Sequence, residues 1–342
     1  MTLEPQASAP SSRLSRRIAV LAVGCALLFL CIVGSFLVGS SHISVESVLT
    51  YLQHPDGSND SYIVNELRKT RTLLGVLVGV CLAVAGAVMQ AVTRNPLADP
   101  GLLGVNAGAS LAIAVGAAVF AAHSTVAQFF LALAGACIAS LIVYLVGNAG
   151  PYGGTPVRLV LAGVAFSTAA GGATSALLMI NPTAFNTFRF WDVGALTRTD
   201  ISLLGLLVPA LAGLGIIASI VPGLSALALG DDAATALGTR VKTVRALALL
   251  ALTLLCAVAT AAAGPIGFVG LMVPYFAGVL VGAHRGWIIA TCAVLGPVLV
   301  LSADILGRVL VRPAEMQVGL LTAFVGSPVL LLLVYKMRGI KR

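Results

Sequence analysis

Residues 86–108 read GAVMQAVTRNPLADPGLLGVNAG and place a polar turn between two long apolar runs. Proline lacks an amide donor and restricts the residue before it, so Pro96 and Pro100 predict a helix boundary here. Non-helical backbone at membrane depth persists only where it is buried in protein or lines a water-filled path. We therefore predict that Asn95, Pro96, Asp99 and Pro100 form a gate or a supporting loop. The simpler alternative is a plain helix end.

The composition excludes a soluble protein. Of 342 residues, 59% are hydrophobic and 9% are charged, and the mean hydropathy is +1.04. A soluble domain of this size would have too little polar surface. The 37 glycines suit close packing of membrane helices. We predict an all-α polytopic membrane protein, surrounded by lipid and without a nucleic-acid partner despite its net charge of +8.

A membrane-crossing helix needs about twenty apolar residues. About ten segments of this kind follow one another along the chain, at 18–39, 71–92, 104–122, 126–147, 157–180, 201–221, 243–263, 266–282, 287–307 and 317–336. We predict a disordered cytoplasmic tail at 1–17, a membrane domain at 18–336 and a cytoplasmic tail at 337–342.

The charged residues predict the orientation. With the N-terminus in the cytoplasm, thirteen of the twenty basic residues lie inside, but only four of the twelve acidic ones. Basic residues favour the cytoplasmic side, so we predict that both termini are cytoplasmic. Trp191 and Trp287, close to predicted span ends, are expected to be interfacial anchors.

The sequence shows no arrangement of cysteines, histidines or glycines that would indicate a disulfide, a metal site or a nucleotide site. The six cysteines all fall in apolar runs, where a free thiol acts as a small hydrophobe. The four histidines have no metal-ligand spacing, and no GxxxxGK[ST] motif occurs. We expect no disulfide, metal, cofactor or nucleotide site, and a chain that is not an enzyme.

A faint internal repeat relates two parts of the chain. CLAVAGAVMQ at 81–90 resembles CAVATAAAGP at 256–265, and a glycine- and proline-rich turn follows each. Gly264 and Pro265 mark the second turn. Related halves with interrupted helices at matching positions are typical of transporters, and the interruptions indicate the pathway. We predict two such halves with broken helices.

Three motifs carry a resemblance to a known family: RTLLGVLVGVCLAVAGAVMQAVTRNPLADPGLLGVNAG at 71–108, GPIGFVGLMVP at 264–274 and EMQVGLLTAFVGSPVLLLLVYK at 315–336. They resemble the FecCD-type (BtuC-like) permeases, the membrane subunits of bacterial ABC importers for iron–siderophores, haem and vitamin B12. RFWDVGALT at 189–197 is similar to an external segment of the family. Tyr275 and Gly278 depart from its usual histidine and arginine.

The resemblance implies a ten-helix permease subunit in a bacterial cell membrane, paired with a second permease subunit, identical or paralogous. Two cytoplasmic ATPase subunits would power it, and an extracytoplasmic binding protein would deliver the cargo, expected to be a ferric siderophore, with haem or cobalamin as alternatives. An ion-driven secondary transporter is the rival. That class needs ionisable residues deep in the bundle, and the central spans offer almost none except Asp304.

The resemblance also implies two contact surfaces. Basic residues at the external mouth would meet acidic groups of the binding protein, which here selects Arg68, Arg71, Arg308 and Arg312. Snorkelling at the lipid interface is the alternative.

Asp304 lies four residues before Arg308, and we favour an intrahelical pair there.

A cytoplasmic ATPase needs a rigid, water-facing surface, and the family places its coupling helices between the sixth and seventh spans. The segment 225–241 occupies that place, and a plain solvated loop is the alternative. We predict that Asp231 and Asp232 cap a helix start there. The predicted ATPase contacts are Gly230, Asp231, Asp232, Ala233, Ala236, Leu237 and Gly238.

Overall fold

The computed structural model describes residues 10–40, 43–120, 122, 124–149, 155–197 and 203–339. Every regular element in this part of the chain is a helix; η1 is a π-helix and η2 a 3₁₀-helix. The elements are α1 (Pro10–Leu37), α2 (Val45–Gln53), α3 (Asn59–Tyr62), η1 (Ile63–Arg68), α4 (Lys69–Thr93), η2 (Pro100–Leu103), α5 (Val105–Val119), α6 (Thr125–Asn148), α7 (Pro156–Ile180), α8 (Pro182–Asp192), α9 (Leu203–Leu227), α10 (Asp231–Ala236), α11 (Val241–Ala263), α12 (Val269–Val281), α13 (Arg285–Leu310) and α14 (Val318–Gly339).

The all-helical membrane class is confirmed. Among the described residues, seven helices are long and apolar enough to cross a membrane, namely α1, the run from α3 to α4, α6, α7, α9, α11 and α13. Three further apolar helices are shorter, namely α5, α12 and the first part of α14. Each of the ten predicted spans therefore coincides with one apolar helix, seven of them of full length.

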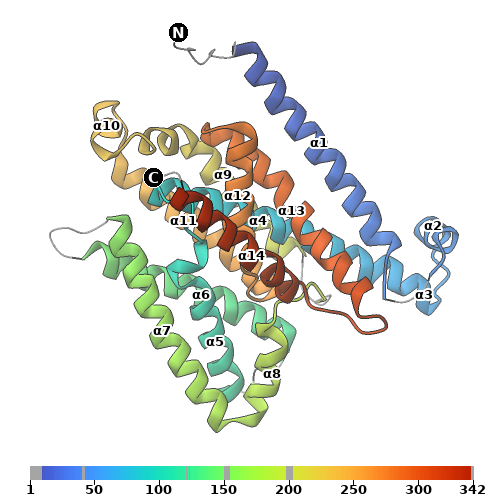
Figure 1. The fold of residues 1–342 in the computed structure, drawn as a ribbon. Helices are drawn as coiled ribbons and strands as arrows, with labels where there is room; N and C mark the ends of the chain where they lie inside the picture. The colour runs from blue at the N-terminus through green and yellow to red at the C-terminus, as the bar shows by residue number, and fades with distance from the viewer. Residues whose placement is uncertain are drawn as a thin grey trace.

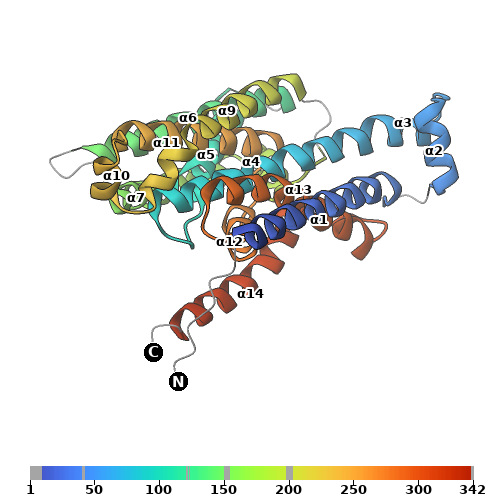
Figure 2. The ribbon, with the colours of Figure 1, turned by 90° about the horizontal axis from the view of Figure 1, so that it is seen from above.

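α4 lies at the centre of the bundle, in contact with α13, α11, α12 and α9 (Figures 1 and 2). The most apolar window of the α3–α4 run is 78% buried, and that of α11 is 72% buried. The corresponding window of α1 is only 11% buried. α1 therefore lies at the periphery, with its apolar face available to lipid.

Glycines allow the central helices to approach each other closely. A Cβ on Gly79 would meet the backbone of Pro297, and a Cβ on Gly86 would meet the carbonyl of Gly270. Small residues are what bring membrane helices into such contact, because lipid supplies no hydrophobic drive between helices. These contacts place α13 and α12 directly against α4.

The two ends of the bundle differ in character. In Figure 1, α10 and the end of α14 lie on the left, and α1 begins at the top. α2 and α3 lie on the right, near the far end of α1. α2 is amphipathic, as its sequence indicates, and Ser44 caps it by accepting a hydrogen bond from the Ser47 amide.

The structure corrects several sequence predictions. Residues 10–17, predicted as part of a disordered tail, are helical, and residues 1–9 lie outside the described residues. The predicted tail at 337–342 begins within α14, which ends at Gly339, and 340–342 lie outside the described residues.

All six cysteines are unpaired.

The prediction that Trp191 is an interfacial anchor is wrong. Its side chain is 1% exposed and packs against Phe188, with ring centroids 6.0 Å apart. Trp287 is half-buried, and the guanidinium of Arg17 lies 5.8 Å from its ring centroid. That pairing of an aromatic ring with a basic side chain suits an interfacial position.

Candidate functional site

The first break, residues 94–104, begins where α4 ends. Arg94 takes the left-handed conformation, with φ at 52°. Oδ1 of Asn95 then accepts a hydrogen bond from the Leu97 amide at 3.0 Å, and Pro96 lies exposed in the same turn. The turn is therefore held by its own side chain, as asparagine turns commonly are.

Asp99 and Pro100 start the second part of this break. Oδ1 of Asp99 accepts from the Gly101 amide at 2.8 Å and caps η2, whose first residue is Pro100. Burial raises the pKa of the Asp99 carboxyl, and the Gly101 hydrogen bond offsets only part of that rise. Gly104, with φ at 75°, starts α5. A compact loop, not merely a helix end, follows α4.

The second break, residues 264–268, packs against other loops. A Cβ on Gly264 would meet the carbonyl of Trp191, and the Ala195 amide donates to the Ala263 carbonyl at 2.7 Å. The carbonyl of Pro265 lies against Gly194. The segment 189–197, whose sequence is similar to an external segment of the family, therefore packs against this break and supports it.

Phe268 adopts a left-handed backbone at the start of α12, with φ at 68°. A bulky residue rarely takes this conformation, and surrounding packing must hold it. The ring lies against Gly326 of α14, where a Cβ would overlap it. The sequence carries no signal for this strained position.

The structure brings the two breaks together across the bundle. Pro100 of the first break packs on Gly270, just after the second break. Nε2 of Gln90 donates to the Leu271 carbonyl at 3.1 Å, and both residues are buried. Segments 170 residues apart in the sequence thus form one packed unit inside the bundle.

α10 is tied to the first break by ion pairs. Oδ1 of Asp231 lies 2.7 Å from Nη2 of Arg94, and its Oδ2 lies 3.0 Å from Nη2 of Arg245 on α11. Gly230, not an aspartate side chain, is the N-cap of α10. The predicted side-chain capping is therefore wrong, although both aspartates lie in the first turn, where a helix dipole favours them.

Much of the predicted coupling segment faces solvent. Asp232, Ala236, Leu237 and Gly238 are exposed, and the Leu237 side chain is 67% exposed. Ala233 is half-buried. An apolar side chain held this far out of the bundle indicates a surface that a partner can cover.

At the opposite end, an ionic cluster surrounds Asp304. The guanidinium of Arg71 binds both Asp304 oxygens, with Nη2 at 2.7 Å from Oδ1. Arg308 pairs with Oδ2 at 2.7 Å, which confirms the predicted intrahelical pair. Arg71 also pairs with Glu315 at 2.6 Å, and Ser40 donates to that carboxylate. Glu315 was inside a quoted motif, but its role depends on contacts that the sequence does not display.

The same cluster holds the carboxyl end of α1. Arg308 donates to the carbonyls of Ser35 and Val38, Arg68 to that of Phe36, and Arg312 to that of Gly39. The last carbonyls of a helix have no partner within the helix and carry partial negative charge. Arginine is well suited to satisfy several of them at once.

The four arginines predicted to dock a binding protein differ in how exposed their side chains are. Arg308 is 1% exposed and Arg68 is 4% exposed, so neither side chain presents its charge to a partner. We assign these two to the support of α1. Arg71 is 12% exposed within its ion pairs, and Arg312 is exposed.

The arrangement defines a class of protein. The described residues form a bundle of apolar helices with two packed breaks, and helices interrupted in this way are typical of transport proteins. The chain belongs to the FecCD transport family, whose model matches residues 25–336. It is the multi-pass permease of a bacterial ABC importer, non-catalytic in itself.

Individual relatives agree over nearly the full length. The chain is 45% identical to the ferric enterobactin transport system permease protein of Escherichia coli, covering 90% of this chain and 92% of the relative. It is 39% identical to the Fe(3+)-citrate import system permease protein of Bacillus subtilis, over 89% and 90%. A solved inward-facing transporter, assigned to the metal-chelate ABC type, matches with a TM-score of 0.80 and 27% identity, over 94% and 99%.

Proposed function

We propose that this chain carries a ferric siderophore across the cell membrane, driven by two cytoplasmic ATPase subunits and supplied by an extracytoplasmic binding protein. It would act beside a second permease subunit, with ten crossings and both termini inside. The long match to a permease named for ferric enterobactin supports the cargo. The family assignment argues against the ion-driven rival, and Asp304 is already neutralised by two arginines.

The observation that carries the coupling proposal is the link from α10 to both breaks. Asp231 joins α10 to Arg94, the residue that ends α4. The loop after Arg94 packs through Pro100 on Gly270, at the start of α12. An ATPase that displaced α10 would thereby shift the packed breaks. A chain of packed contacts and ion pairs of this kind can carry coupling between distant sites.

At the external end, we propose that Arg312 and the exposed edge of Arg71 meet acidic groups of the binding protein. Charges at such a rim set the speed and orientation of docking more than the final affinity. Arg68 and Arg308 would hold α1 in place behind them.

Uptake of radioactive iron in a strain lacking this gene tests the cargo. We expect iron offered as a catecholate siderophore to enter only when the chain is restored. Iron citrate, a hydroxamate chelate, haem and labelled cobalamin, offered in parallel, reveal any other cargo. Import of cobalamin or haem, with no siderophore import, would contradict the proposal.

A pull-down in detergent tests the partners. The purified chain is expected to retain ATPase subunits, and charge removal at Arg312 is expected to slow binding-protein association at low salt. Retention of ATPase by a variant with α10 deleted would show that coupling occurs elsewhere.

A further inference from the structure

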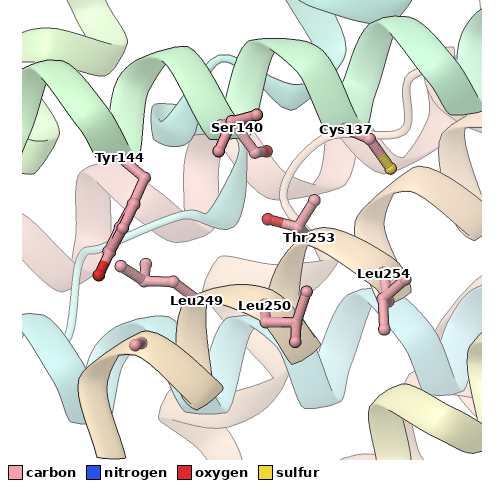
Figure 3. A pocket seen from close by; sticks show the side chains of 9 residues that line it. Cys137, Ser140, Tyr144, Leu249, Leu250, Thr253 and Leu254 are labelled. Atoms are coloured by element: carbon pink, nitrogen blue, oxygen red, sulfur yellow. The ribbon is translucent and has the colours of Figure 1, made fainter. Parts of the chain in front are cut away.

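A cleft lies between α6 and α11 (Figure 3). Its volume is about 280 Å³, near the lower end of small-molecule sites. Two of its lining residues, Leu141 and Leu250, are 56% and 50% exposed, so the cleft opens on the outer surface of the bundle. An apolar cleft open to this side is accessible to a hydrocarbon chain.

Three side chains with hydroxyl groups, Ser140, Tyr144 and Thr253, lie among the mostly apolar residues that line this cleft. Ser140 is 8% exposed, Thr253 is 9% exposed, and both line the wall in Figure 3. Oγ of Ser140 is buried and has no hydrogen-bond partner among the described residues. A buried hydroxyl without a partner costs free energy, so the site favours an occupant that brings an acceptor such as an ester carbonyl.

The cleft adjoins a larger polar groove at the α10 end of the bundle, of about 930 Å³. Tyr144 and Ala246 line both spaces, so the two meet there. Lys242 and Thr253, one in each space, are separated by about 16 Å along α11, given 1.5 Å per residue. That is about half of a 30 Å hydrocarbon core, which corresponds to one leaflet.

The charges of the groove suit an anion. Arg240 and Lys242 are exposed at the start of α11, and that helix start has no side-chain cap. Its first amides therefore remain as donors, where a phosphate binds favourably. Of the acids in the groove wall, Asp231 is already paired with Arg94 and Arg245, which leaves Asp232 as the opposing exposed charge.

We propose that an anionic phospholipid of the inner leaflet binds here, with its phosphate at Arg240 and Lys242 and one acyl chain in the cleft. Basic pockets between membrane helices on the cytoplasmic side are suited to anionic headgroups. The site borders α10, so its occupancy would bear on the segment that we propose for coupling. The binding itself does not depend on that proposal.

Native mass spectrometry of the delipidated full chain in detergent tests the site. Phosphatidylglycerol and phosphatidylcholine with identical acyl chains are titrated separately, and glycerol phosphate serves as the headgroup alone. We expect phosphatidylglycerol to bind more tightly than phosphatidylcholine, and glycerol phosphate to bind much more weakly than the lipid. Tight binding of glycerol phosphate alone would reduce the site to a phosphate site and overturn the proposal.

Two variants locate the lipid. Replacing both Arg240→Gln and Lys242→Gln is expected to weaken phosphatidylglycerol binding about twenty-five-fold, since each basic residue near a membrane surface contributes about fivefold. The control, Arg13→Gln with Arg16→Gln, removes the same charge from α1 and is expected to change nothing. Equal weakening by both pairs would indicate a diffuse lipid shell and overturn the proposal.

Filling the cleft with Ser140→Phe is expected to weaken the lipid about tenfold or more while glycerol phosphate binding stays the same. Gel filtration checks the fold of this variant. If the Ser140→Phe variant does not fold, the variants at Arg240 and Lys242 still test whether the lipid binds at this site. Unchanged phosphatidylglycerol binding in a folded Ser140→Phe variant would overturn the acyl-chain assignment.

Discussion

Arg94 and Asp231 form an ion pair of 2.7 Å although they are 137 residues apart in the sequence. Arg94 ends α4, the helix at the centre of the bundle, and Asp231 begins α10 at its surface. Arg245 binds the same carboxylate from α11. One aspartate thus connects the proposed ATPase contact to the two helices that are most deeply buried.

Replacing Asp231→Asn is expected to reduce transport more than stability. The pair with Arg94 is exposed, with side chains at 39% and 41%, and exposed pairs contribute at most about 1 kcal/mol to folding. The same change also removes the pair with Arg245, whose side chain is 11% exposed, so a further modest loss of stability is expected. Loss of a coupling contact is expected to lower uptake about fivefold or more. Thermal unfolding in detergent and uptake in cells measure the two effects. Glu46→Gln, which removes an exposed acidic charge from α2, is the control, and equal loss of uptake in both variants would argue against the link.

Replacing Asp304→Asn is expected to destabilise the fold by about 3–5 kcal/mol, because Arg308 would keep its buried charge without its carboxylate partner, and Arg71 would be left with Glu315 alone. Thermal unfolding monitored by gel filtration gives the measurement. Adding Arg308→Met to this variant removes the unpaired charge and is expected to restore part of the stability. No recovery in the double variant would show that the loss has another cause.

Replacing Gly86→Ala is expected to cost about 1–3 kcal/mol, because its Cβ would overlap the Gly270 carbonyl and force the helices apart. The control is Gly171→Ala, where no atom lies within 4 Å of the added Cβ. Alanine favours a helix over glycine, so the control is expected to be neutral or slightly stabilising. Comparable losses at both positions would mean that helix contact does not explain the effect.

The stability of the chain is expected to fall in acid partly through Glu315. Burial raises the pKa of this carboxyl. The charge of Arg71 and the hydrogen bonds from Arg71 and Ser40 lower the pKa by more than burial raises it, so it lies below the ordinary value of 4.5. A depressed folded pKa adds stability above the unfolded pKa, and that stability is lost as pH falls through the folded value.

The measurement is the difference in unfolding temperature between the native chain and Glu315→Gln from pH 6 to the most acid pH at which both stay folded. This difference cancels the opposite contribution of Asp99, whose pKa is raised. We expect the gap to narrow as pH falls below about 4.5, the ordinary glutamate value. A gap that stayed constant would show that Glu315 makes no pH-dependent contribution.

The local sequence alone determined the helices and the breaks. Long apolar runs must become helices in lipid, since the backbone has no other way to satisfy its hydrogen bonds. Asn95, Pro96, Asp99 and Pro100 similarly predicted a turn from their own chemistry, and the structure places a compact loop there. The spacing of Asp304 and Arg308 predicted their pair within one turn of helix.

Partners distant in the chain were decided only by the tertiary structure. Arg308 and Arg68, read as external charges, instead bind the carbonyls at the end of α1, because helices 31 or more residues away pack beside them. Trp191, predicted to be an interfacial anchor, is 1% exposed, and the second break packs on its backbone carbonyl. Hydropathy and local turn chemistry act over a few residues, whereas burial and ion pairing depend on which helices become neighbours, and one sequence does not display that.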